Sequence, residues 1–144
     1  DRDLRLAAGG GASGGLGAGL AGVLGARLLP RFDVLLDHAA LDAKVARADL
    51  VLTAEGAIDF QTPNGKVPAE VARRAKLANK PVIALAGTIG AGARATHEAG
   101  IDAYTGIVAA PSSLSEAFDR AAELVTDATE RTLRLVLVGS SLCA

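Results

Sequence analysis

The sequence predicts an α/β fold built around a small parallel sheet. After a glycine-rich beginning, its second two-thirds alternates strand-like and helix-like segments in the order β-α-β-α-β-α, with short connections. That order favours parallel strands, right-handed crossovers and helices that cover the sheet. Three strands make only a half-sheet, so we expect further strands to come from residues outside this chain.

The first predicted element is a glycine-rich loop that opens into a helix. Nine of the 17 glycines lie within residues 9–25, in a stretch without charges. So many glycines and so few large apolar side chains argue against a membrane-spanning helix, and the leader lacks the basic region of a signal peptide. Small residues let backbone N–H groups approach an anion, or another backbone, closely. The loop therefore indicates either an anion or substrate contact or a tightly packed helix start.

The later elements follow from apolar spacing, capping residues and turn residues. Apolar runs predict strands at 49–53, 81–86 and 101–108, and helical spacing predicts helices at 33–46, 68–78 and 113–137, with a short helix ending near residue 98. Pro68 stands at a first helical position, where its missing N–H costs nothing. Ser113 and Glu116 form a capping-box pattern at the start of the last helix.

Composition excludes several classes of protein. The chain has 144 residues, of which 50% are apolar and 22% charged, and its net charge of -1 lacks the basic excess of an electrostatic nucleic-acid binder. The single cysteine, Cys143, excludes a disulfide framework or a cysteine zinc site and fits a cytoplasmic protein. We therefore predict no nucleic-acid or membrane partner. Because the chain begins with Asp1 and contains no Met, we expect it to be part of a longer protein.

The densest polar cluster follows the first predicted strand. In open parallel sheets, ligands bind beyond the carboxyl ends of the strands, which are expected here at 53–55, 87–90 and 108–113. Six polar side chains gather after the first of these ends: Glu55, Asp59, Gln61, Thr62, Asn64 and Lys66. Two carboxylates and an amide could hold a hard divalent cation, and a Lys just before a helix N-terminus favours phosphate or carboxylate. The alternative is a solvated polar loop in which Asp59 or Thr62 acts as a cap.

Four blocks of the sequence resemble the type 1 glycerate kinases, the two-domain glycerate 2-kinases. They stand in the family's order and at matching spacing: GGGASGGLGAGL at 9–20, DLVLTAEGAIDFQTPNGKVP at 49–68, PVIALAG at 81–87 and GIDA at 100–103. The resemblance covers nearly the whole chain. It has two departures, since Ala54 and Ala57 stand where the family usually has Gly and Arg. The second departure removes a guanidinium that could bind phosphate or carboxylate.

The resemblance implies an ATP-dependent kinase that phosphorylates D-glycerate to 2-phosphoglycerate with Mg²⁺. It also implies a Rossmann-like or flavodoxin-like α/β domain into which a second α/β domain is inserted. On this map, residues 1–48 would be the C-terminal end of the inserted domain. Residues 49–144 would be the C-terminal part of the Rossmann-like domain, so the active kinase would be the full-length protein.

The resemblance further suggests a role for each matching position. Glu55 and Asp59 are the candidate Mg²⁺ ligands and catalytic carboxylates, and Lys66 is the catalytic candidate that would neutralise the phosphate or the glycerate carboxylate. The candidates for substrate or phosphate binding are Gln61, Thr62, Gly14, Gly15 and Gly17. Two alternatives remain: a non-catalytic α/β fragment that binds a nucleotide or another anion, and a self-associating fragment, which leaves a homo-oligomer open.

Overall fold

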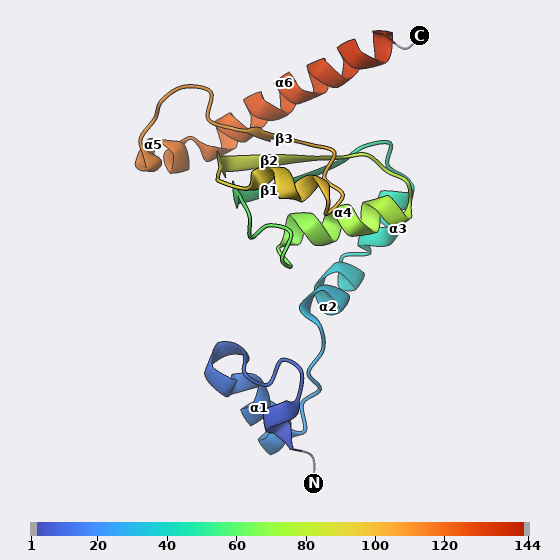
Figure 1. Ribbon diagram of the computed structural model, residues 1–144, viewed down its shortest axis with the longest axis vertical. Helices are drawn as coiled ribbons and strands as arrows, with labels where there is room; N and C mark the ends of the chain where they lie inside the picture. Colours follow the sequence, from blue (N-terminus) through green and yellow to red (C-terminus); the bar gives the residue numbers. More distant parts are fainter. Residues whose placement is uncertain (1–2, 143–144) are drawn as a thin grey trace. The chain divides into compact units, whose positions relative to one another are not determined.

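The computed structural model describes residues 3–142, which form two compact units, one ending at Asp42 and the other beginning at Ala43. Figure 1 shows the first unit as helical and the second as a sheet with helices. The boundary lies six residues before the one expected from the sequence. That the first unit is the end of an inserted domain stays a prediction.

The first unit contains a short 3₁₀ helix, η1 (Leu4–Leu6), followed by α1 (Ala12–Leu24) and α2 (Arg31–His38). The expected loop and helix are not cleanly separated, because α1 begins at Ala12 and yet leaves the right-handed helical conformation at Ser13, Gly14 and Gly15, whose φ values are 51°, 69° and 92°. Regular helix follows from residue 16.

Two glycines of this unit are needed for close backbone packing. A Cβ on Gly10 would lie 2.8 Å from the Leu4 carbonyl oxygen, and one on Gly17 would lie 2.8 Å from the Gly9 carbonyl oxygen. Both distances are shorter than real Cβ atoms show, so any larger residue would displace the backbone. The tightly packed helix start expected as one alternative is therefore present, and the anion contact stays a prediction.

The second unit is a three-stranded parallel sheet with the order β1-β2-β3, formed by β1 (Val51–Ile58), β2 (Val82–Ile89) and β3 (Ala103–Gly106). The expected parallel α/β arrangement is confirmed at this level. The first two strands extend beyond the expected ends and the third is shorter. β1 continues because Ala57 and Ile58 still pair with Thr88 and Ile89 of β2.

The helix α3 (Leu41–Ala46) crosses the boundary between the units in the sequence. The other helices of the second unit are α4 (Val67–Leu77), the 3₁₀ helix η2 (Ala93–His97), α5 (Leu114–Asp119) and α6 (Ala121–Leu142). Two expected helices are each wrong as single elements. The 33–46 helix is broken into α2 and α3 at Ala40, whose φ is 50°. The 113–137 helix is broken into α5 and α6 at Arg120, whose backbone N–H closes the last turn of α5 on Glu116 and Phe118.

The sheet is covered on both faces, with α4 on one side and α6 on the other (Figure 1). On the α6 side, Leu85, Ile107 and Ala128 form a buried apolar cluster. On α4, Ala72 and Ala75 are fully buried. Small alanines let the helix lie close to the strands, so this core needs few large side chains. None of the helices in residues 3–142 combines the length and the apolar character that crossing a membrane requires.

Candidate functional site

The candidate site is a cavity of about 680 Å³ at the carboxyl ends of the three strands. Residues from all three expected strand ends line it, namely Glu55 from β1, Thr88 from β2, and Ser112 from the loop after β3. The walls are otherwise largely apolar and come from the last two helices: Leu114, Ala117, Phe118, Ala121 and Val125. A mostly apolar cavity with a few polar groups is the usual form of a small-molecule site.

Glu55 brings a carboxylate to this cavity. It lies in β1 opposite Ala86 of β2, so the sheet itself fixes its backbone. Its Oε2 atom is buried and has no hydrogen-bond partner among the described residues. A buried polar atom without a partner is costly, and a cation or a hydroxyl group would remove that cost. Glu55 therefore has the features of a ligand-binding carboxylate.

Asp59 begins the polar turn that follows β1. One carboxylate oxygen accepts a hydrogen bond from the Gln61 backbone N–H at 2.9 Å, and the Asp59 N–H donates to the Thr62 hydroxyl at 3.1 Å. The Thr62 side chain is fully buried, and its N–H donates to the Asp59 carbonyl. Both residues thus cap the turn, as the polar-loop alternative expected.

Lys66 closes the same turn from its other end. Its Nζ lies 3.2 Å from Asp59 Oδ1 and 3.3 Å from the Ala57 carbonyl oxygen. Lys66 is also the N-cap residue of α4, so the start of that helix places its backbone. An ammonium group has three N–H donors, so these two bonds leave a third for a ligand.

The environment of Asp59 keeps it ionised. The hydrogen bond from the Gln61 N–H is the largest influence lowering the pKa of the Asp59 carboxyl, and the Lys66 ammonium lowers it further, against the opposing effect of partial burial. The side chains of Asp59 and Lys66 are about one-quarter exposed, at 24% and 25%. Their charges are therefore accessible to an incoming ligand.

The structure brings only part of the expected site together. Asp59, Gln61, Thr62 and Lys66 share one turn, whereas Glu55 lines the cavity before it. In the part of the chain described, no three His, Cys, Asp or Glu side chains gather as a metal site. Mg²⁺ is commonly held by one or two carboxylates together with substrate phosphates, so the tentative pair of Glu55 and Asp59 stays a prediction. The candidates Gly14, Gly15 and Gly17 lie in the first unit.

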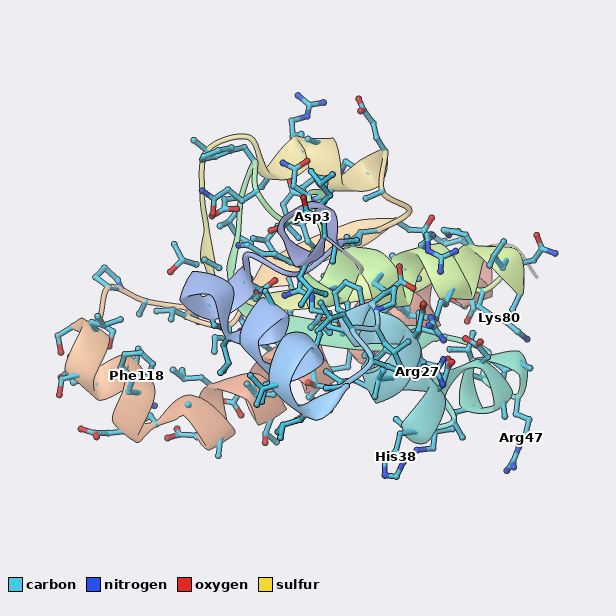
Figure 2. The ribbon with its side chains drawn as sticks, turned by 90° about the horizontal axis from the view of Figure 1, so that it is seen from below. Asp3, Arg27, His38, Arg47, Lys80 and Phe118 are labelled. Atoms are coloured by element: carbon cyan, nitrogen blue, oxygen red, sulfur yellow. The ribbon has the colours of Figure 1, made fainter. Side chains whose placement is uncertain are left out.

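Sequence reasoning missed the cavity walls. Leu114 and Phe118 are apolar residues of the last predicted helix, and that spacing indicated a buried face. In the structure both lie on the short helix α5 and are exposed, Leu114 by 71% and Phe118 by 72%. Figure 2 shows the side chain of Phe118. The sequence shows the apolar face of this helix, but it does not indicate that the face borders a cavity.

Comparison with known proteins shows which protein family the chain is similar to. A family model described as the glycerate kinase family matches residues 1–137. A glycerate kinase of Bacillus cereus is 43% identical over 121 residues, which cover 84% of this chain and 32% of that protein. A glycerate 2-kinase of Escherichia coli is 35% identical over 137 residues, which cover 95% of this chain and 36% of that protein.

A solved structure agrees with these relatives. The crystal structure of a glycerate kinase 2 from Salmonella typhimurium LT2 matches with a TM-score of 0.70 and 39% identity, over 92% of this chain and 34% of that one. The chain thus spans about a third of the length of the proteins it matches, and the matched region is their C-terminal part. It belongs to the glycerate kinase family.

Proposed function

We propose that this chain is the C-terminal part of an ATP-dependent glycerate kinase. The full-length protein would transfer the γ-phosphoryl group of ATP to a hydroxyl of D-glycerate, giving 2-phosphoglycerate with Mg²⁺. Family membership supports the reaction class. The observation that carries the assignment of the site is the Oε2 atom of Glu55 at the wall of the strand-end cavity, which is buried and has no hydrogen-bond partner within residues 3–142.

In this proposal Glu55 holds the cation. A carboxylate oxygen suits the hard Mg²⁺ ion, and this oxygen has no partner among the described residues. When bound, Mg²⁺ would supply neutralisation of the phosphate charge. The sheet register fixes the backbone of Glu55 before any ligand arrives, which limits the reorganisation that binding requires.

Asp59 would accept the proton of the attacking hydroxyl. Its lowered pKa keeps it ionised at neutral pH but makes it a weak base. Phosphoryl transfer depends mainly on positioning and charge stabilisation, so a weak base in the right place suffices. The buried Thr62 would act by holding Asp59, and the exposed Gln61 side chain would orient the substrate.

Lys66 would bind the anionic groups of the ligands through its third N–H. Its bonds to Asp59 and to the Ala57 carbonyl fix the ammonium near the polar turn. Lys66 would also supply the positive charge for anion binding that an Arg usually supplies at position 57 in the family, where this chain has Ala. Gly14, Gly15 and Gly17 are proposed to let the backbone of their own loop approach a substrate or phosphate group closely.

The test is an assay of the gene product that carries this sequence, expressed at its full length. With ATP, D-glycerate and MgCl₂ present, we expect ADP release that requires all three, and a 2-phosphate ester identified by phosphorus NMR. Absence of glycerate-dependent ADP release from a folded preparation would contradict the proposal. Binding of MgATP without turnover would favour the non-catalytic nucleotide-binding alternative instead.

A further inference from the structure

The segment 87–92, which ends β2 and continues into the following loop, runs alongside the segment that carries the two candidate carboxylates. Strand pairing joins Ile58 to Ile89 at the ends of β1 and β2. Beyond the strands, the Gly90 N–H donates to the Ile58 carbonyl at 2.8 Å, and the Phe60 N–H donates to the Ala91 carbonyl at 3.0 Å. The two backbones are therefore bonded to each other at several points between Glu55 and Phe60.

Three glycines make this close approach possible. A Cβ on Gly87 would lie 2.6 Å from the Gly56 carbonyl oxygen, which adjoins Glu55 in the chain. A Cβ on Gly90 would lie 3.1 Å from Asp59 Cβ. A Cβ on Gly92 would lie 2.8 Å from Phe60 Cβ, and its φ of +74° would strain any other residue.

We propose that Gly87, Gly90 and Gly92 are positioning residues, which fix where the chain holds Glu55 and Asp59. This inference rests on the proposed function and deepens it. Each glycine meets a different point along the carboxylate-bearing segment, so an added methyl group at each would push a different part of it. The backbone hydrogen bonds leave that segment little room to move away without breaking them.

Two other glycines of the second unit do not share this feature. A Cβ on Gly106, at the end of β3, would meet its first neighbour only at 3.8 Å, and one on Gly139 in α6 would meet nothing within 4 Å. Neither has a left-handed backbone. Gly106 thus offers a matched control in the same sheet, and Gly139 a second control outside it.

The test compares Gly90→Ala with Gly106→Ala in the full-length gene product. The 3.1 Å contact at Gly90 is the mildest of the three and requires Asp59 Cβ to move by only a few tenths of an ångström, so we expect the variant to fold. Since misplacement of catalytic groups by about 1 Å can reduce rates about a hundredfold, we expect kcat for glycerate to fall about tenfold in Gly90→Ala. We expect kcat to be unchanged in Gly106→Ala. In both variants, KM for ATP and the melting temperature should stay close to the wild-type values.

The more severe Gly87→Ala should also raise the Mg²⁺ concentration that gives half-maximal activity, because it pushes on the residue next to Glu55.

A second readout does not depend on catalysis. Hydrogen exchange of the Phe60 amide should become faster in Gly90→Ala and stay unchanged in Gly106→Ala, because only the first variant disturbs the bond to Ala91. Wild-type kcat and wild-type exchange in Gly90→Ala would overturn the inference, as would equal losses in both variants. If the wild-type protein shows no glycerate kinase activity, the proposed function fails, and the exchange of Phe60 alone decides whether the glycines hold this segment.

Discussion

At the scale of single residues, the two carboxylates of the candidate site differ in the hydrogen bonds that they accept from the rest of the chain. The Asp59 carboxylate accepts hydrogen bonds from the Gln61 N–H and from the Lys66 ammonium, so its charge is already stabilised by the chain. Glu55 has one buried oxygen with no partner in the described region. The two carboxylates therefore differ in kind, and the one with the unmet oxygen is the better candidate for the cation.

The Asp59–Lys66 pair gives the first prediction. In the full-length gene product, Asp59→Asn and Lys66→Ala should each lower kcat for glycerate about tenfold or more, because each removes a charge expected at the reacting groups. Steady-state kinetics measure the change. Lys44→Ala, which removes an exposed lysine on α3, should leave kcat unaltered. Normal kcat in both site variants would contradict the assignment.

A structural ion pair on α4 gives a pH prediction. The Arg73 side chain, followed by Arg74, lowers the pKa of Glu70 from 4.5 to about 2, against the effect of burial. The folded state therefore favours the ionised form of Glu70. Its contribution to the free energy of unfolding is complete above about pH 4.5 and is lost as pH falls toward about 2.

The test of this linkage compares two variants of the chain by thermal melts over a range of pH. The free energy of unfolding of Glu70→Gln should be lower than that of the wild type by roughly 1–3 kcal/mol at neutral pH. Between about pH 5 and pH 3, the melting temperature of the variant should fall less than that of the wild type. The control Glu130→Gln removes an exposed pair with Arg134 and should change stability by less than about 0.5 kcal/mol. Parallel curves for wild type and Glu70→Gln would show that the pair does not contribute.

At the scale of elements, the short helix α5 decides the shape of the cavity, because it carries Leu114 and Phe118 in the wall. Only six residues long, α5 depends on its first turn. The Glu116 N–H donates to the Ser113 hydroxyl at 3.3 Å, and the Ser113 N–H donates to the Glu116 carboxylate at 2.9 Å. This reciprocal capping compensates for the small number of hydrogen bonds within the helix.

Loss of this cap should therefore make α5 unfold locally more often. Ser113→Ala is expected to cost about 1 kcal/mol, expressed as faster hydrogen exchange of the amides in 114–119. Exchange should be unaffected in Ser115→Ala, because Ser115 is an exposed residue within the helix. Unchanged protection of α5 in Ser113→Ala would show that tertiary contacts, and not the cap, hold the helix.

The same scale shows what the sequence could predict. The parallel β-α-β-α-β-α order and the capping box were readable, because they follow from apolar spacing and local residue types. The full length of β1 was not, because Glu55–Gly56–Ala57 has no strand-like composition and becomes part of a strand through pairing with β2. The break at Arg120 has no Gly or Pro to mark it. Likewise, the polar residue types of the site were evident, whereas the pairing of Lys66 with Asp59 depends on the fold of the turn.

At the scale of the whole molecule, the cavity is open. Leu114 and Phe118 in its wall are about 70% exposed, at 71% and 72%. Phosphoryl transfer is favoured where water is excluded and the charged groups act in a low-dielectric site. The 144 residues correspond to about a third of each relative, so the remaining cover is proposed to come from the other parts of the full-length protein.

This openness predicts that the 144-residue chain by itself has no glycerate-dependent ADP release, whereas the full-length gene product does. Both proteins would be assayed at equal concentration, after circular dichroism has established that each is folded. Substantial activity in the 144-residue chain would mean that the open cavity is sufficient for the reaction.

The sheet order also has a consequence for the time course of folding. Val51 pairs with Val82, which is 31 positions later in the chain, and Ile83 pairs with Ala103 after a further 20. At a synthesis rate of roughly 5–20 residues per second, β1 leaves the ribosome roughly 2–6 s before β2 does. During that interval the strand bearing Glu55 lacks its partner β2, and the arrival of β2 sets the earliest moment at which the pairing of Glu55 opposite Ala86 can form.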